Sequence, residues 1–97
     1  MEREGFIYIL SNYSNEVLYI GVTSNLKRRL SEHKKHTKEG FTDKYNTTKV
    51  LYVERTPRII DAIEREKVLK KWSRTKKLQL IKKQNPTFKD LFYEIMN

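Results

Sequence analysis

The longest apolar run in the sequence, residues 6–10 (FIYIL), is only five residues long. A membrane-spanning helix needs about 20 apolar residues, and a signal peptide needs an apolar segment of roughly 7–15 residues behind a basic start. Residues 1–4 are charged with mixed sign. We therefore expect no signal peptide, no membrane partner and a cytoplasmic location. A run of this length, rich in Ile and Tyr, instead predicts a β-strand.

Two further segments have strand character, at 17–21 and at 49–54. A polar turn at 11–16 separates the first of them from residues 6–10, and this pattern predicts a β-hairpin. Neither hairpin strand alternates cleanly between apolar and polar residues. We therefore expect helices on both faces of the sheet.

Helices are predicted from capping residues and from the Asn85-Pro86 break. They run from a cap at Thr23, Ser24 or Asn25 to about His36, from Thr56-Pro57 to about Lys71, from Ser73 to about Lys83, and over 87–96; a polar loop covers 37–47. The predicted order is β-β-α-β-α-α with a short C-terminal helix. This order indicates one α/β (α+β) domain over residues 1–97, with a small three-stranded antiparallel or mixed sheet flanked by helices.

The composition excludes several kinds of chemistry. The chain has no cysteine, so a disulfide framework, a Cys-ligated zinc site and thiol chemistry are excluded. Two histidines do not indicate a histidine-based zinc site. A glycine-rich phosphate loop is missing from the sequence, which argues against nucleotide hydrolysis and a small-molecule cofactor.

The net charge indicates an anionic partner. Lys and Arg number 21 against 12 acidic residues, a net charge of +9, and residues 65–83 hold nine basic residues and one acid, Glu66. A field of this sign attracts phosphates, so we expect nucleic acid as the partner. Anionic membrane or ribosome association produces the same charge pattern, as does a well-solvated basic surface.

Glu66 occupies an unusual place in the predicted helix at 57–71. At roughly 100° per residue, Ile59, Ala62 and Ile63 share one face and Glu66 falls at the centre of that face, whereas Glu64 does not. A carboxylate on an apolar face needs a cation, a hydrogen-bond donor or a metal. The alternative is that Glu66 lies at the solvated edge of the face or pairs with an arginine for structural reasons.

The helix at 25–36 repeats this pattern. Arg29 and His33 share one face with Leu26 and Leu30, and Arg28 points elsewhere. Arginine suits bidentate contact with a phosphate. The alternatives are an arginine stem lying along the core with its head in water and a partly buried, hydrogen-bonded histidine.

The hairpin contributes two tyrosines. If Leu10 faces Val17, then Tyr8 faces Tyr19, and both side chains project from one side of the sheet. A tyrosine in a strand is usually a core residue with its hydroxyl at the rim. Two tyrosines, an arginine, a histidine and a carboxylate on inward-facing positions of neighbouring elements nevertheless suggest a phosphodiester site.

These residues make the chain resemble a GIY-YIG endonuclease domain. Tyr19-Ile20-Gly21 matches the second half of the family motif, while residues 5–8 (GFIY) match the first half with one extra residue. Residues 19–33 match the family's strand-to-helix pattern. The segments 62–67, 70–72, 76–78 and 85–86 are similar to the small single-domain bacterial branch of UPF0213 type. The resemblance covers about 6–95.

The resemblance implies a metal-dependent endonuclease that leaves a 5′-phosphate and a 3′-hydroxyl. Its catalytic residues would be Tyr8, Tyr19, Arg29, His33 and Glu66, and Glu66 would bind Mg²⁺ or Mn²⁺. A base role for Tyr8 needs nearby positive charge, which Arg29 and the metal would supply. Some members of the family carry a lysine where this chain has Val22, and Lys27, Arg28 or His33 would have to compensate.

A substrate-binding surface is expected along the basic stretch. Its members are Arg28, Arg65, Lys70, Lys71, Arg74, Lys76, Lys77 and Asn85, the last by resemblance. Trp72 can stack on a base, although a packing role is the more common one. We expect a monomer that acts on structured DNA, rather than RNA, in repair, recombination or processing. The alternatives are a nucleic-acid-binding module that cuts weakly or not at all, and an adaptor on the ribosome or membrane surface.

Overall fold

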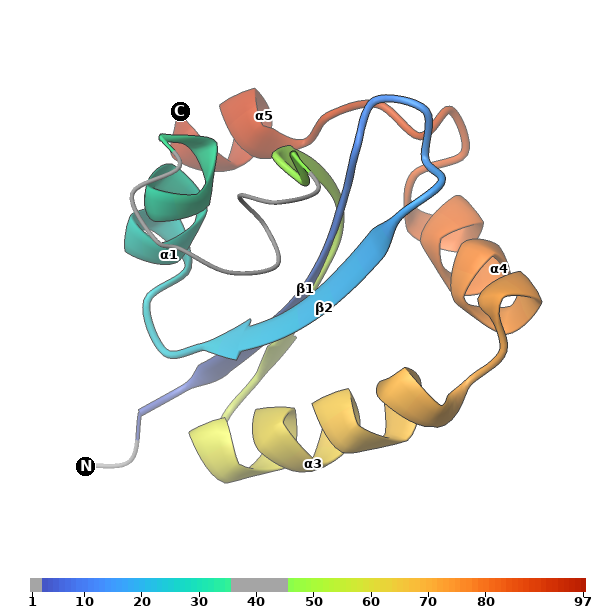
Figure 1. Cartoon of the computed structure of the whole chain (residues 1–97). Helices are drawn as coiled ribbons and strands as arrows, with labels where there is room; N and C mark the ends of the chain where they lie inside the picture. The colour runs from blue at the N-terminus through green and yellow to red at the C-terminus, as the bar shows by residue number, and fades with distance from the viewer. Residues whose placement is uncertain (1–2, 36–45) are drawn as a thin grey trace.

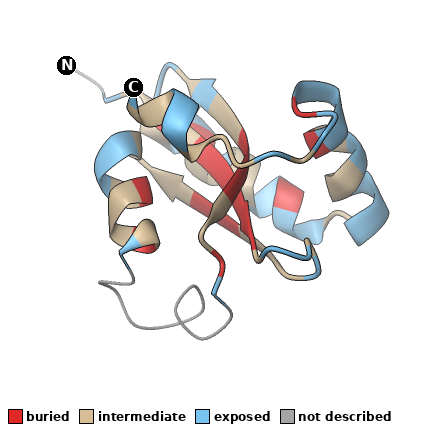
Figure 2. Ribbon diagram, turned by 90° about the horizontal axis from the view of Figure 1, so that it is seen from above, coloured by how far each residue is buried: buried red, intermediate tan, exposed pale blue. Residues whose placement is uncertain are grey.

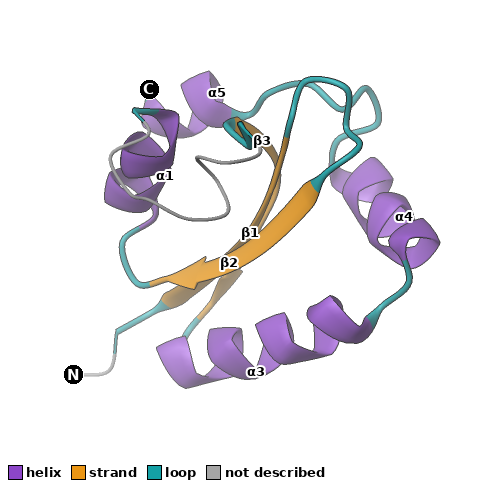
Figure 3. Ribbon diagram, in the orientation of Figure 1, coloured by secondary structure: helices purple, strands orange, loops and turns teal. Residues whose placement is uncertain are grey.

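The computed structural model describes residues 3–35 and 46–97. Its elements are β1 (Gly5–Ser11), β2 (Leu18–Thr23), α1 (Leu26–Lys34), β3 (Lys49–Thr56), α3 (Ile59–Lys71), α4 (Arg74–Gln84) and α5 (Phe92–Met96) (Figures 1 and 3). This order confirms the predicted β-β-α-β-α-α arrangement with a short C-terminal helix. The predicted helix end at His36 and most of the predicted loop at 37–47 lie outside the described residues.

The three strands form one antiparallel sheet of order β2-β1-β3, as the α+β prediction required. The turn between β1 and β2 is held by Asn12, whose Oδ1 accepts hydrogen bonds from the backbone N–H groups of Glu16 at 2.9 Å and Val17 at 3.1 Å. Asn15 has a φ of 60°, which asparagine tolerates better than most residues. The hairpin therefore follows from local turn chemistry.

Helices cover both faces of the sheet, as predicted, and each face has its own core. The larger core contains Ile7, Ile9, Ile20, Leu51, Tyr52, Ala62, Leu69 and Ile81 and lies under α3 and α4. The smaller core contains Tyr8, Leu10, Leu30 and Val50 and lies under α1 and α5. In Figures 1 and 2 the sheet separates the two helix pairs, and buried residues concentrate on the strands.

Two of the three predicted helix caps are correct. Asn25 caps α1, with its Oδ1 accepting from the Arg28 N–H at 3.2 Å, and Ser73 caps α4, with its Oγ accepting from the Lys76 N–H at 3.2 Å. The predicted cap at Thr56 is wrong because β3 continues through Thr56, whose hydroxyl donates to the Arg58 carbonyl at 2.7 Å. Helix α3 consequently begins at Ile59.

The first helical N–H group of α3 is satisfied from a distant part of the chain. The Ile59 N–H donates to the Arg3 carbonyl at 2.8 Å. Gly5 permits this close approach, because a Cβ atom at Gly5 would lie 2.6 Å from the Ala62 Cβ. The start of β1 therefore positions the helix that carries Glu66.

The last helix is shorter than the predicted 87–96. The Asn85 side chain donates to the Lys89 carbonyl at 2.8 Å and accepts from the Lys89 N–H at 3.2 Å, and Phe88 has a φ of 55°. These contacts hold the segment before α5 in a non-helical turn. Within residues 3–35 and 46–97, no helix combines the length and apolar character needed to cross a membrane.

Candidate active site

Tyr8 lies in the central strand with its phenol directly above the backbone of Gly21. The residue is fully buried, and a Cβ atom placed on Gly21 would overlap Cζ and Oη of Tyr8 and lie 2.8 Å from Cε2. Only glycine leaves room for the phenol at this position. Gly21 is therefore required for the Tyr8 ring to pack in this position.

The predicted pairing of the two tyrosines is corrected by the strand register. Tyr8 pairs with Gly21, and Leu10 rather than Tyr8 pairs with Tyr19. The prediction was off by two residues because the turn spans 12–17 rather than 11–16, and moving a turn by one residue changes the pairing by two. A shift of two residues leaves each side chain on the same face. The two rings are still near each other, with centroids 6.3 Å apart.

Helix α1 brings His33 and Arg29 to the Tyr8 hydroxyl. His33 Nε2 lies 2.9 Å from Tyr8 Oη, and Arg29 Nε donates to the same oxygen at 3.4 Å. The His33 ring also lies against Tyr19, with centroids 5.7 Å apart. Leu30, buried in the smaller core, anchors the helix between these two polar residues. The face predicted to carry Arg29 and His33 therefore does point at the sheet.

The positive charge of Arg29 does not make Tyr8 acidic. Burial raises the pKa of Tyr8 to about 12, and the electrostatic influence of Tyr19 and Glu66 acts in the same direction. The hydrogen bond and charge of Arg29 lower this pKa but do not offset the burial. Without a metal ion, Tyr8 is therefore a neutral hydrogen-bonding group at pH 7, and the expected base role needs positive charge beyond that of Arg29.

Arg29 combines a buried contact with partial solvent access. Its side chain is 30% exposed, and its Nη1 lies 3.8 Å from Glu32 Oε1. The hydrogen bond to Tyr8 raises the pKa of Arg29 further above its already high ordinary value. The guanidinium is thus permanently charged and held at the rim of the phenol cluster.

Glu66 lies on α3 and is largely shielded from solvent, with 16% of its side chain exposed. Its charge acts on the Tyr8 phenol, so the carboxylate belongs to the same electrostatic environment. Lys70, one turn later, places its Nζ 3.5 Å from Glu66 Oε1. The predicted position of Glu66 off the solvent face is confirmed, and its partner on the helix is a lysine.

The donor set fits a divalent metal ion that needs few protein ligands. Among the residues that the structure describes, there is no group of three or more His, Cys, Asp or Glu side chains suited to a metal. A hard cation of the Mg²⁺ type is often held by one or two carboxylates, with waters and substrate phosphates completing its shell. A single shielded carboxylate whose charge acts on the Tyr8 phenol matches that mode of binding.

The residues predicted to bind substrate are not all free to do so. Arg65 donates to Glu54 Oε1 at 3.0 Å, Arg74 donates to the Glu16 carbonyl at 2.7 Å and to the Asn15 carbonyl, and Lys70 pairs with Glu66. Lys71 and Lys76 are exposed and Lys77 is half-buried. The basic stretch thus divides into structural and solvent-facing members.

Two further predicted contacts lie apart from the phenol cluster. Asn85 is 1% exposed, and its amide also donates to the Leu51 carbonyl at 3.1 Å, which is a structural role in place of the expected substrate contact. Arg28 lines a polar pocket of about 440 Å³ with Arg3, Glu4, Ser24 and Asn25. Arg28 therefore lines a pocket that has no lining residue in common with the phenol cluster.

Two features escaped the sequence reasoning. The first is the packing of Tyr8 on Gly21. A glycine inside a strand was the available signal, because such a glycine often marks the close approach of another group. The second is a pocket of about 470 Å³ beside Trp72, to which Gln79, Lys82 and Lys83 contribute. No motif indicated this pocket, because its lining comes from the exposed side of a helix.

Comparison with known proteins shows similarity to one domain family and to one set of small proteins. The model of the GIY-YIG catalytic domain matches residues 4–79. A UPF0213 protein of Syntrophus aciditrophicus is 39% identical over 85 residues, which are 86% of this chain and 94% of that protein. A UPF0213 protein of Natronomonas pharaonis is 32% identical over 81 residues, with 84% and 94% covered.

A solved structure has the same fold. The solution NMR structure of a UPF0213 protein from Bacillus halodurans superimposes with a TM-score of 0.58 at 23% identity. The match covers 90% of this chain and 92% of that chain. At this identity the likeness concerns the arrangement of the strands and helices.

Proposed function

This chain belongs to the GIY-YIG family, in its UPF0213 branch, and we propose that it is a metal-dependent endonuclease that hydrolyses phosphodiester bonds in DNA. The family is generally one of nucleases that use divalent metal ions, which makes nucleic acid the substrate class. The observation that carries the proposal is the convergence of His33 Nε2 and Arg29 Nε on the Tyr8 hydroxyl, 2.9 and 3.4 Å away.

Arg29 acts on the scissile phosphate. Its Nε is engaged with Tyr8, while the rest of the partly exposed guanidinium donates hydrogen bonds to the phosphoryl oxygens. These bonds strengthen as negative charge develops on the oxygens in the transition state. Because the orientation of Arg29 is fixed by Tyr8, little reorganisation is needed when the substrate binds.

Tyr8 and His33 handle the proton of the attacking water. With its proton on Nδ1, His33 accepts the Tyr8 O–H at Nε2. Tyr8 Oη is buried in the free protein, and when substrate binding admits the attacking water it accepts a proton from that water as its own proton passes to His33. The water oxygen bonds to phosphorus while the bond from phosphorus to the 3′ oxygen breaks. The products carry a 5′-phosphate and, after protonation, a 3′-hydroxyl. Tyr19 packs against both rings and orients them.

Glu66 would hold a Mg²⁺ or Mn²⁺ ion, which would supply stabilisation of the negative charge on the leaving oxygen. Lys70 keeps the carboxylate in place in the free protein and releases it as the site fills. Substrate phosphates beyond the cleaved bond are bound by the exposed lysines of residues 65–83. We propose a monomer acting in the cytoplasm on branched or flapped DNA during repair or recombination.

Cleavage of labelled DNA tests this function. Branched, single-stranded and duplex substrates are incubated with the protein and Mg²⁺ or Mn²⁺, and we expect cleavage that stops when the metal is chelated. Glu66→Gln should reduce the single-turnover rate by about 100-fold or more, because it removes the metal-binding carboxylate. Glu64→Gln, an exposed position on the same helix, should cut at the wild-type rate.

Cutting that survives chelation, or an undiminished rate in Glu66→Gln, would contradict the proposal. A second candidate, a module that binds DNA without cutting it, is favoured by Val22 at the position where some members of the family carry a lysine. Tight binding of branched DNA with no cleavage in either metal would establish that second function.

A further inference from the structure

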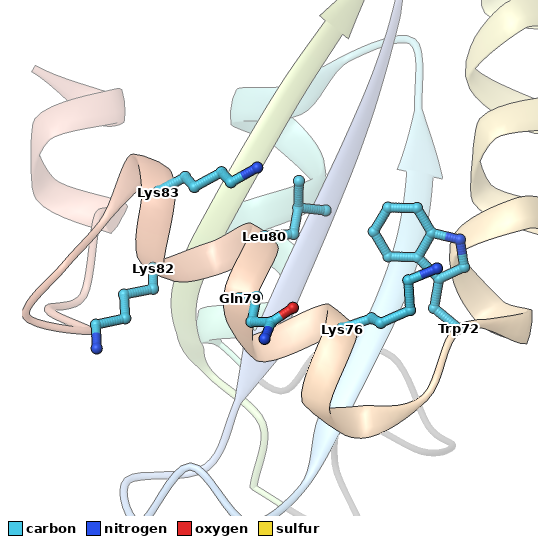
Figure 4. A pocket seen from close by; sticks show the side chains of 6 residues that line it. All are labelled: Trp72, Lys76, Gln79, Leu80, Lys82 and Lys83. Carbon is cyan, nitrogen blue, oxygen red and sulfur yellow. The ribbon is translucent and has the colours of Figure 1, made fainter.

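A second concave surface lies at the junction of α3 and α4, away from the phenol cluster. This Trp72 pocket has a volume of about 470 Å³ and is lined by Trp72, Lys76, Gln79, Leu80, Lys82 and Lys83. In Figure 4 the indole and the Lys76 side chain lie together at one end of the pocket, and the other lining residues follow along α4. It shares no lining residue with the site around Tyr8.

The pocket combines an aromatic wall with positive charge. Arg65 lies 5.4 Å from the Trp72 ring and is itself tied to Glu54, so it fixes the indole from the protein side. Lys76 is an exposed residue whose Nζ lies 4.8 Å from the centroid of the same ring. A flat ligand can displace a flexible lysine from an indole, whereas it cannot displace an arginine held by a salt bridge.

We propose that the Trp72 pocket binds an unpaired nucleobase of a single-stranded DNA segment, stacked on the indole. This inference rests on the proposed function, since it assigns a subsite to the same substrate. Bases stack on aromatic side chains irrespective of sequence, and lysines neutralise the adjoining phosphates. Lys82 and Lys83 supply that charge, and the Gln79 amide can donate to or accept from the edge of a base.

The position of the pocket is compatible with one continuous strand. Trp72 follows Glu66 by six residues at the end of the same helix, about 9 Å along its axis. A single strand that leaves the cleavage site therefore reaches the pocket within a few nucleotides. Occupation of the pocket requires an unpaired base, so it would select substrates that contain a single-stranded arm.

The intrinsic fluorescence of the protein reports directly on this pocket, because Trp72 is the sole tryptophan of the chain. The protein is titrated with a short oligothymidylate in the absence of divalent metal. We expect saturable quenching of the tryptophan emission. An abasic oligonucleotide of the same length, which has the same phosphates but no bases, should bind more weakly and leave the emission nearly unchanged.

Variants separate stacking from charge, with binding followed by the anisotropy of labelled DNA. Trp72→Leu should weaken oligothymidylate binding by about 5- to 100-fold and leave blunt duplex binding almost unaltered. Trp72→Phe, which keeps a ring, should fall between Trp72→Leu and the wild type. Lys82→Gln with Lys83→Gln should flatten the salt dependence, whereas Lys35→Gln, an exposed lysine outside residues 65–83, should change it less.

Bound oligothymidylate without quenching, equal behaviour of the abasic oligonucleotide, or unaltered binding by Trp72→Leu would each overturn this inference while leaving the nuclease proposal intact. Failure of the wild-type protein to bind any DNA would overturn both. If Trp72→Leu does not fold, as judged by its circular dichroism and duplex binding, the wild-type quenching and the abasic control still decide the question.

Discussion

The phenol of Tyr8 is both a core side chain and the centre of the polar cluster. Packing over Gly21 removes it from water, and this burial raises its pKa to about 12. The same burial fixes Tyr8 Oη between His33 and Arg29. Burial therefore fixes the position of the Tyr8 hydroxyl but makes Tyr8 a weaker acid. For this reason the proposed mechanism passes the Tyr8 proton to His33 instead of using a Tyr8 phenolate.

Substituting Gly21 should show that the position of the Tyr8 hydroxyl depends on the space above this glycine. In Gly21→Ala the added methyl group meets the Tyr8 ring, so the phenol has to move and its hydrogen bond to His33 breaks. We expect an unfolding free energy lower by about 1–3 kcal/mol, the usual cost of overpacking, and a cleavage rate lower by about 100-fold. Urea unfolding and single-turnover cleavage measure the two effects.

A double-mutant cycle provides the control for Gly21→Ala. Tyr8→Leu removes the ring that the new methyl group would strike, so adding Gly21→Ala to Tyr8→Leu should cost less stability than adding it to the wild type. Additive losses would show that the methyl group harms the fold by another route.

At single positions, the sequence predicted which helix faces turn to the sheet better than it predicted the strand pairing. Glu66, Arg29 and His33 were identified because each is a polar residue on a helix face that is otherwise apolar, and α1 and α3 do turn those faces to the sheet. The pairing of Tyr8 with Gly21 was missed because it depends on where along the chain the turn lies, and a displacement by one residue changes the pairing by two. The role of Asn85 was misjudged because a buried amide and a substrate-binding amide look alike in a sequence.

Among the elements, α1, β3 and α5 are joined through one carboxylate. Asp90 accepts hydrogen bonds from Lys34 Nζ at 2.7 Å, from the Val50 N–H at 2.9 Å and from the Phe92 N–H at 3.0 Å. Burial by itself would raise the pKa of Asp90, but these three donors outweigh it and hold the pKa below its usual range. The folded protein therefore stabilises the ionised form of Asp90 relative to its protonated form.

This linkage predicts a pH-dependent stability. Because the pKa of Asp90 is lower in the folded than in the unfolded protein, its contribution is complete above the ordinary aspartate pKa of about 3.9 and is lost as the pH falls through the folded pKa. Asp90→Asn should lower the unfolding free energy at pH 7 and reduce its decline towards pH 3. Urea titrations at both pH values measure this.

The matched control for Asp90 is Asp61→Asn, which changes an exposed carboxylate in the first turn of α3. Its effect at pH 7 should be smaller, and it should leave the acid-induced decline as steep as in the wild type. An equal effect of the two substitutions would mean that Asp90 does not join the three elements.

Element types and order could be read from the sequence, whereas several boundaries could not. Strands and helices follow from local patterns, and Asn25 and Ser73 are caps that act within their own helix. The start of α3 depends on the Arg3 carbonyl, and the start of α5 depends on Asn85. Both are contacts between residues distant in sequence or buried by the fold, which a local pattern does not contain.

At the scale of the whole molecule, the net charge of +9 predicts salt-dependent binding of DNA. The logarithm of the affinity should fall linearly with the logarithm of the salt concentration, by roughly 0.9 for each phosphate neutralised. Lys71→Gln and Lys76→Gln, at exposed positions, should each flatten the slope by about that amount. Anisotropy titrations of a labelled duplex across a salt series give the slope.

Arginines of the same basic stretch provide the contrast. Arg65→Gln and Arg74→Gln remove groups already engaged by Glu54 and by the hairpin carbonyls, so they should lower stability more than they change the slope. A flat salt response of the wild-type protein would reject the basic stretch as a binding surface.

The two cores of unequal size have a consequence for how the protein responds to heat. Tyr8, Arg29 and His33 meet where α1 rests on the smaller core, while Glu66 belongs to the layer that covers the larger one. Layers with little buried apolar contact are the first to open. Warming should thus abolish the proposed cleavage activity at a lower temperature than global unfolding. Helix α1 would separate from the sheet and carry Arg29 and His33, two of the proposed catalytic residues, away from Tyr8, and cooling would return them.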